Sequence, residues 1–175
     1  MSGKTMEWQQ QKVGFFPAFF NLAETSRLVR IAEQYRELGG EEIFFSHGGY
    51  YEALAKDAGF FVQRVEPIYT EEQMQDLMKY DRREKKGDPF PDTWLNEHIH
   101  NEEDAYRNHG VSLVVTGFNL PCVLSVRKAK IPLLYIIPGT CLPAYFKSGL
   151  ATFPEEFENM LIRMLPYRLK NWIAN

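Results

Sequence analysis

Residues 11–46 have the pattern of a strand, a loop, a helix and a second strand, and this unit limits the chain to few folds. The apolar run 12–16 ends at a proline, and small and polar residues follow it. From Ser26 onward, apolar side chains recur at spacings of three and four until Gly39 ends the helical pattern. A second apolar run, 42–46, comes directly afterwards. A strand–helix–strand unit with short connections is the building block of parallel sheets.

Three further apolar runs fit strands of the same sheet, at residues 60–67, 111–117 and 131–137. The right-handed crossover rule and the short connections predict the strand order 3-2-1-4-5. The predicted fold is therefore a doubly wound, Rossmann-like α/β sheet. The predicted helices are at 50–59, 70–81, 92–106, 119–130 and 154–165.

The segment between the third and fourth strands is longer and richer in charge than the other connections. Residues 70–110 predict two amphipathic helices, which we interpret as a helical insertion before the fourth strand. Such an insertion either shapes a substrate pocket or is plain packing. We expect one domain over residues 12–175, preceded by a flexible N-terminus at 1–11.

Composition excludes several partners. The formal net charge of −3, Glu84 within the basic cluster 82–86 and Asp88 after it argue against a nucleic-acid surface. Two distant cysteines, Cys122 and Cys141, predict reduced thiols in a cytoplasmic protein. No apolar run reaches the roughly 18 residues that a membrane span needs.

Ligands of open parallel sheets bind beyond the carboxyl ends of the strands, so the loops there supply the candidate residues. The substrate-binding candidates, in chain order, are Asn21, Ser26, Arg27, His47, Thr116, Asn119 and Thr140. Three of these residues have alternative, purely structural roles: a surface ion pair for Arg27, a hydrogen-bonded loop residue for His47 and a helix cap for Asn119.

Motifs for cofactors and metals are absent. The sequence has no nucleophile elbow, phosphate loop or GxGxxG pattern, so no cofactor is expected. His98, His100 and His109 do not have the spacing of a metal motif, and no metal is expected. Four phenylalanines near the first strand could line an apolar pocket or belong to the core: Phe15, Phe16, Phe19 and Phe20.

Four stretches in order resemble the N-terminal, acceptor-binding half of GT-B glycosyltransferases, the kind that includes UDP-glucosyl and UDP-glucuronosyl transferases. They are 21–43, 57–62, 112–118 and 129–136. The resemblance implies transfer of a sugar from a nucleotide sugar, bound by a second domain, to a hydroxylated small-molecule or glycan acceptor. Without that nucleotide-sugar-binding C-terminal domain, the chain should not be active.

The chain departs from this family where many members have a catalytic histidine and its orienting aspartate. It has Ala23 and Glu24 at the first position, and Thr116 and Gly117 at the second. A glutamate can accept a proton without a partner that fixes a tautomer, so Glu24 is the candidate catalytic base. The alternative role for Glu24 is to stabilise the start of the following helix.

Two functions of different classes remain open from the sequence. The first is the acceptor-binding half of a glycosyltransferase, and the second is a non-catalytic, Rossmann-like binding or interaction module. A flavodoxin-like or response-regulator domain is disfavoured because no acidic cluster or phosphate loop follows the first strand. Apolar surface near the chain end would allow a homodimer.

Overall fold

The computed structural model describes residues 11–82 and 84–138. Contacts divide the chain into two compact units, residues 1–136 and 137–175, and the described helices and strands belong to the first. The predicted helix at 154–165, Thr140 and Cys141 lie outside the described residues. The prediction of a single domain over 12–175 stays a prediction.

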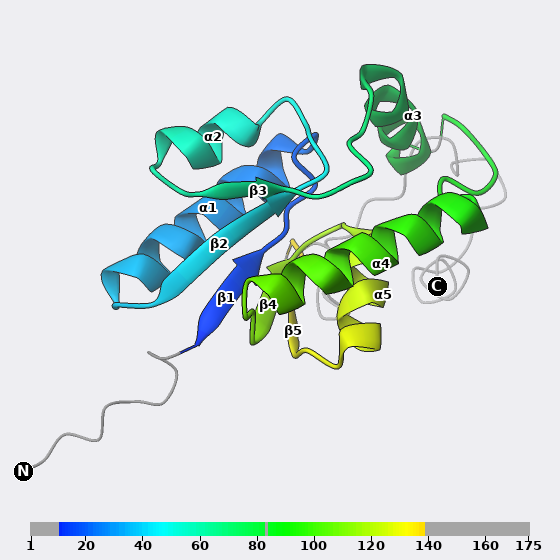
Figure 1. Cartoon of the computed structure of the whole chain (residues 1–175). Helices are drawn as coiled ribbons and strands as arrows, with labels where there is room; N and C mark the ends of the chain where they lie inside the picture. Colours follow the sequence, from blue (N-terminus) through cyan, green and yellow to red (C-terminus); the bar gives the residue numbers. More distant parts are fainter. Residues whose placement is uncertain (1–10, 83, 139–175) are drawn as a thin grey trace, which may run out of the picture. The chain divides into compact units, whose positions relative to one another are not determined.

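One five-stranded parallel sheet organises this unit, in the order β3-β2-β1-β4-β5 (Figure 1). This confirms the predicted order. All four neighbouring strand pairs are parallel, with Phe15 of β1 beside Phe44 of β2 and Val115 of β4. The strands are β1 Lys12–Phe15, β2 Glu41–Ser46, β3 Val62–Arg64, β4 Leu113–Thr116 and β5 Leu133–Tyr135.

Helices cover both faces of the sheet (Figure 1). The helices are α1 Leu22–Glu37, α2 Glu52–Asp57, α3 Glu71–Asp81, α4 Asp92–Asn108 and α5 Leu120–Ala129. Because side chains of a strand alternate between faces, Phe44 joins the core with α1 and α2, whereas Phe45 joins the core with α4 and α5. The chain is therefore doubly wound, as predicted.

The helical insertion before β4 consists of α3 and α4. Thr70 caps α3 in a capping box, in which its hydroxyl accepts from the Gln73 N–H and the Gln73 side chain accepts from the Thr70 N–H. A small cluster of Tyr69, Met74, Leu77 and Phe90 joins α3 to the start of α4. No helix within the described residues is long and apolar enough to cross a membrane.

The start of α1 differs from the sequence prediction. The helix begins at Leu22 rather than Ser26, because the Asn21 side chain accepts a hydrogen bond from the Glu24 N–H at 3.1 Å and caps it. The loop after β1 is therefore short, and Glu24, Ser26 and Arg27 lie on the helix. Helix α4 begins at Asp92, as predicted, and its N-cap residue is Pro91, which makes no side-chain hydrogen bond there.

Candidate functional site

A cavity of about 560 Å³ opens at the carboxyl end of the sheet. Loops after β1 and β4 form one part of its lining, and α3 with the loop before α4 forms another. Its lining residues are Ala18, Phe20, Asn21, Leu22, Ala23, Tyr51, Leu77, Met78, Tyr80, Arg82, Pro89, Phe90, Phe118 and Leu120. Apolar and aromatic side chains predominate, which is the usual character of a small-molecule site.

A second, much smaller cavity of about 20 Å³ shares five lining residues with the large one. His47 and Asn119 line only this small cavity. Its volume is about that of a single water-sized group. The large cavity thus lies beside a small recess that carries the side chains of His47 and Asn119.

The phenylalanines after β1 divide between core and cavity. Phe15, Phe16 and Phe19 are at most 1% exposed and belong to the core. Phe20 lines the cavity. Three of the four phenylalanines therefore belong to the core, and the fourth lines the apolar cavity.

Glu24 joins the loops that follow β1 and β4. Its Oε1 accepts the backbone N–H of Ala18 at 3.2 Å and that of Gly117 at 3.0 Å. A Cβ atom at position 117 would lie 2.7 Å from the Glu24 carboxyl carbon, so this close approach requires glycine. The Glu24 side chain is 1% exposed, and Oε2 has no partner among the described residues.

Burial raises the pKa of Glu24 above its ordinary value. The nearby backbone N–H groups of Ala18, Phe118 and Gly117, and the charge of Arg27, oppose this rise without cancelling it. A buried carboxyl with a raised pKa and an unpartnered oxygen has the properties of a proton acceptor or donor. Glu24 lines neither cavity.

Thr116 and Asn119 hold the same two loops together. The Thr116 hydroxyl donates to the Phe16 carbonyl at 2.6 Å, and the Asn119 amide donates to that carbonyl at 3.4 Å. Asn119 also caps α5 by accepting the Cys122 N–H. Helix capping therefore occurs at Asn119, and the residue lines the small cavity as well.

Ser26 and Arg27 lie away from the cavity. Both line a shallow depression along the outer surface of α1, together with Arg30 and Gln34. The early start of α1 explains this, because it turns these two side chains out of the loop in which the sequence placed them. The structure thus brings Asn21, His47 and Asn119 to the two cavities, but not Ser26 or Arg27.

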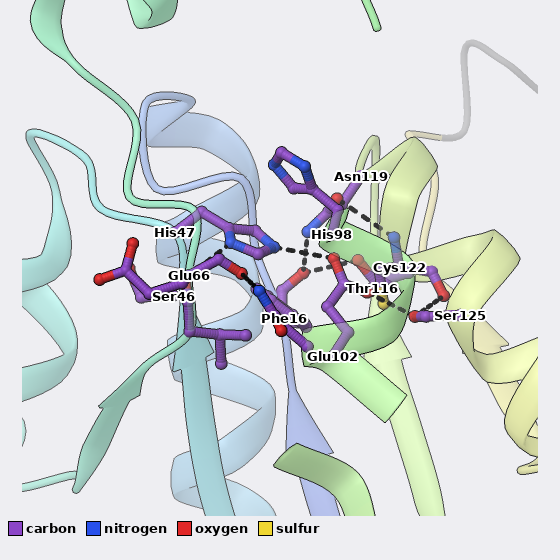
Figure 2. A network of polar contacts seen from close by, with 12 residues as sticks. Phe16, Ser46, His47, Glu66, His98, Glu102, Thr116, Asn119, Cys122 and Ser125 are labelled. Carbon is purple, nitrogen blue, oxygen red and sulfur yellow. Dashed lines mark hydrogen bonds and ion pairs between the residues drawn. The ribbon is translucent and has the colours of Figure 1, made fainter. Parts of the chain in front are cut away.

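A buried polar network at the end of β2 was not predicted from the sequence (Figure 2). His47 Nε2 lies 2.8 Å from Glu102 Oε1, and His47 Nδ1 donates to the Val65 carbonyl at 2.8 Å. The other oxygen of Glu102 accepts from the hydroxyls of Ser125 and Tyr106. His47 and Glu102 are 3% and 0% exposed, so the network is sealed within the protein.

His98 stands beside this network on α4. Its ring lies 4.5 Å from that of His47 and is surrounded by Tyr69, Phe90 and Trp94. Its Nδ1 donates to the Trp94 carbonyl, and its Nε2 has no partner among the described residues. Burial and the neighbouring His47 lower the pKa of His98 to about 4, so the ring is neutral at pH 7.

No group of three metal-binding side chains occurs in the part of the chain that the structure describes. Cys122 is a free, buried thiol, as predicted, and burial raises its pKa well above the ordinary value.

The fold resembles parts of two solved structures. The chain has a Rossmann-like α/β fold, and both structures share it. MurG from Acinetobacter baumannii has a TM-score of 0.51 and 16% identity, over 71% of this chain and 33% of that one. A glycosyltransferase from Rickettsia africae ESF-5 has a TM-score of 0.52 and 10% identity, over 79% of this chain and 33% of that one.

These two likenesses concern the fold. The chain spans about a third of the length of each of the two proteins. No protein-family model and no curated protein matches the sequence.

Proposed function

We propose that the chain is the acceptor-binding half of a nucleotide-sugar-dependent glycosyltransferase. The observation that carries this proposal is the apolar cavity at the carboxyl end of a parallel sheet whose fold resembles part of two glycosyltransferases. A second domain would supply the nucleotide sugar. Cytoplasmic location and a homodimer stay predictions.

The lining of the cavity favours a small apolar acceptor over a glycan. Among the described residues of the lining, Asn21 brings an amide, Arg82 a charge, and Tyr51 and Tyr80 hydroxyl groups, whereas sugar hydroxyl groups need many polar partners. An aromatic or aliphatic alcohol would bury its apolar body there and direct its hydroxyl group toward the small recess lined by His47 and Asn119.

Glu24 is the proposed catalytic base. In an inverting transfer, the acceptor oxygen bonds to the sugar carbon, the nucleoside diphosphate leaves, and a base takes the hydroxyl proton. The unpartnered Oε2 of Glu24 is the atom that would receive it. This role requires the loops at Ala18 and Gly117 to part when the acceptor binds.

A non-catalytic binding module is the second candidate, and the burial of Glu24 favours it. The Oε1 atom already binds two backbone N–H groups, so the carboxyl group has a structural role that needs no reaction. In this alternative, the cavity binds an apolar ligand and Glu24 only holds its loops.

Binding of a neutral aromatic alcohol tests the cavity. We expect 2-naphthalenemethanol to raise the melting temperature of the chain, and UDP-glucose alone to leave it unchanged. Phe118→Ala should weaken the effect of the alcohol, because Phe118 lines the cavity and is 46% exposed. Phe61→Ala is the matched control, because Phe61 is 63% exposed and lies outside the lining. Equal loss in both variants would contradict the assignment of the cavity.

Turnover in the complete enzyme separates the two candidate functions. Glu24→Gln keeps an oxygen for the two backbone N–H groups but cannot take a proton, so sugar transfer should fall by about a hundredfold or more. The measurement is single-turnover transfer to the same alcohol, with the melting temperature as the control for folding. Unchanged transfer in a folded variant would remove Glu24 from the mechanism.

A further inference from the structure

Tyr69 lies in the loop between β3 and α3, at the wall of the small recess, the cavity of about 20 Å³. Its backbone N–H donates to the His47 carbonyl at 2.6 Å. Its ring packs against those of His47 and Trp94, with distances of 5.3 and 5.4 Å between ring centroids. The side chain is 8% exposed, so the backbone hydrogen bond and the neighbouring rings fix its position.

Three of the described residues that line the recess have polar side chains: His47, Tyr69 and Asn119. Both ring nitrogens of His47 lie 2.8 Å from oxygen atoms of the protein, and the Asn119 amide group bonds to two backbone groups (Figure 2). The Tyr69 hydroxyl has no hydrogen-bond partner among the described residues. It is therefore the polar group of the recess that is left for a ligand.

The Tyr69 hydroxyl can both donate and accept a hydrogen bond at neutral pH. Burial, and then the nearby Glu102 and Cys122 side chains, raise its pKa well above the ordinary value, so the group keeps its proton. A buried hydroxyl without a partner costs free energy, and a ligand that supplies the partner removes this cost. The recess has room for about one water-sized group, so this partner is a single small group such as a hydroxyl.

The recess adjoins the large cavity, so one ligand can occupy both. Phe20 and Phe90 line both cavities, and the centroid of the Phe20 ring lies 6.2 Å from that of Tyr69. A ligand whose apolar body fills the large cavity would therefore reach Tyr69 with a group that projects from this body. A carboxylate is disfavoured as that group, because no cationic side chain among the described residues lines the recess.

We propose that Tyr69 selects ligands by their hydroxyl group: it forms a hydrogen bond with a primary alcohol that enters the recess from the large cavity. The ligand class is then a primary alcohol on an apolar body. A site that hydrogen-bonds a ligand hydroxyl discriminates against an isostere without one, because its own polar group then stays unpaired. This inference deepens the proposed function and rests on the cavity being the ligand site.

A pair of isosteric ligands and one substitution test this role. 2-Naphthalenemethanol and 2-ethylnaphthalene differ by the exchange of a hydroxyl for a methyl group, and Tyr69→Phe removes only the hydroxyl of the protein. The measurement is the ratio of the two dissociation constants, from the fluorescence of the naphthalene ring. The cost of taking each ligand out of water is the same for both proteins and cancels. We expect the ratio to shift about fivefold or more in favour of 2-ethylnaphthalene in Tyr69→Phe.

Tyr80→Phe is the matched control, because Tyr80 lines the large cavity but not the recess. This variant should keep the native ratio. The melting temperature separates ligand recognition from a structural role of the hydroxyl. A hydroxyl without a partner stabilises nothing, so Tyr69→Phe should melt no lower than the native protein.

Three results would overturn the inference while the cavity assignment stands: an unshifted ratio in Tyr69→Phe, an equal shift in Tyr80→Phe, or a lower melting temperature of Tyr69→Phe. Absence of binding by both ligands to the native protein contradicts the cavity assignment itself and overturns the inference with it. Failure of the inference alone can thus be told from failure of the proposed function.

Discussion

Glu52 is a buried carboxylate that its hydrogen-bonding partners keep charged. Its side chain is 4% exposed, yet it contacts the Arg64 guanidinium, the Lys56 ammonium and the Ser46 hydroxyl. Burial alone would raise its pKa, but these hydrogen bonds together outweigh burial and lower the pKa to about 2. Because Ser46 ends β2 and its hydroxyl also accepts the Gly48 N–H, Glu52 stabilises the turn that carries His47.

Glu52→Gln should lower the free energy of unfolding at pH 7 by about 2 kcal/mol. This value is smaller than the pKa shift alone would give, because the side chains of Arg64 and Lys56 are at least half exposed and solvent screens their charges. The folded pKa is depressed, so this stability is present above the unfolded value of 4.5 and is lost as the pH falls toward 2. Urea unfolding of both proteins at a series of pH values measures it.

The exposed Glu97→Gln serves as the control and should leave stability unchanged at every pH. A difference between Glu52→Gln and native protein that is as large at pH 2 as at pH 7 would show that charge is not the cause.

At the scale of elements, the sequence predicted the sheet because its signals are local. Short, continuous runs of β-branched and aromatic residues mark the strands, and glycines after the helices mark the helix ends. Thr70, followed three residues later by Gln73, is a capping box in sequence and in structure. The strand order follows from the crossover rule, which needs no side-chain detail.

The sequence contains a helix-capping signal at the start of α1, but the apolar periodicity outweighed it in the prediction. Asn21 and Glu24 have the spacing of a helix cap and an acidic residue in the first turn, which favours a start at Leu22. The apolar periodicity, which becomes regular only later, favoured Ser26. Capping fixes a helix start through one specific hydrogen bond, whereas periodicity fixes only its buried face.

The His47–Glu102 contact could not be predicted from local signals in the sequence. Its two residues are 55 positions apart and come from a strand end and the middle of a crossover helix. Glu102 lies among acidic neighbours, Glu103 and Asp104, that are on the solvated side of α4, and only packing selects which of the three is buried. Helical periodicity places such a residue on a face, but the partner across that face depends on the tertiary fold.

At the scale of the whole unit, the sheet joins two separate apolar layers. The layer with α1 and α2 centres on Phe44, whose ring lies 5.3 Å from that of Phe15 and 4.9 Å from that of Phe60. The opposite layer has Phe45, Tyr106 and Val114 at its centre. Because the same strands form the floor of both layers, neither layer can lose its packing without disturbing the cavity at the strand ends.

Phe44→Ala should therefore destabilise the whole sheet. Phe44 is 0% exposed, so its truncation leaves a cavity and should cost about 3 to 5 kcal/mol of unfolding free energy. Amide-exchange protection should fall in β4 and α5 as well as around the substitution, since the strands unfold together. Phe61→Ala, at a position 63% exposed, should change the free energy by less than about 0.5 kcal/mol. Loss of protection confined to α1, α2 and β2 would instead mean that the two layers unfold independently.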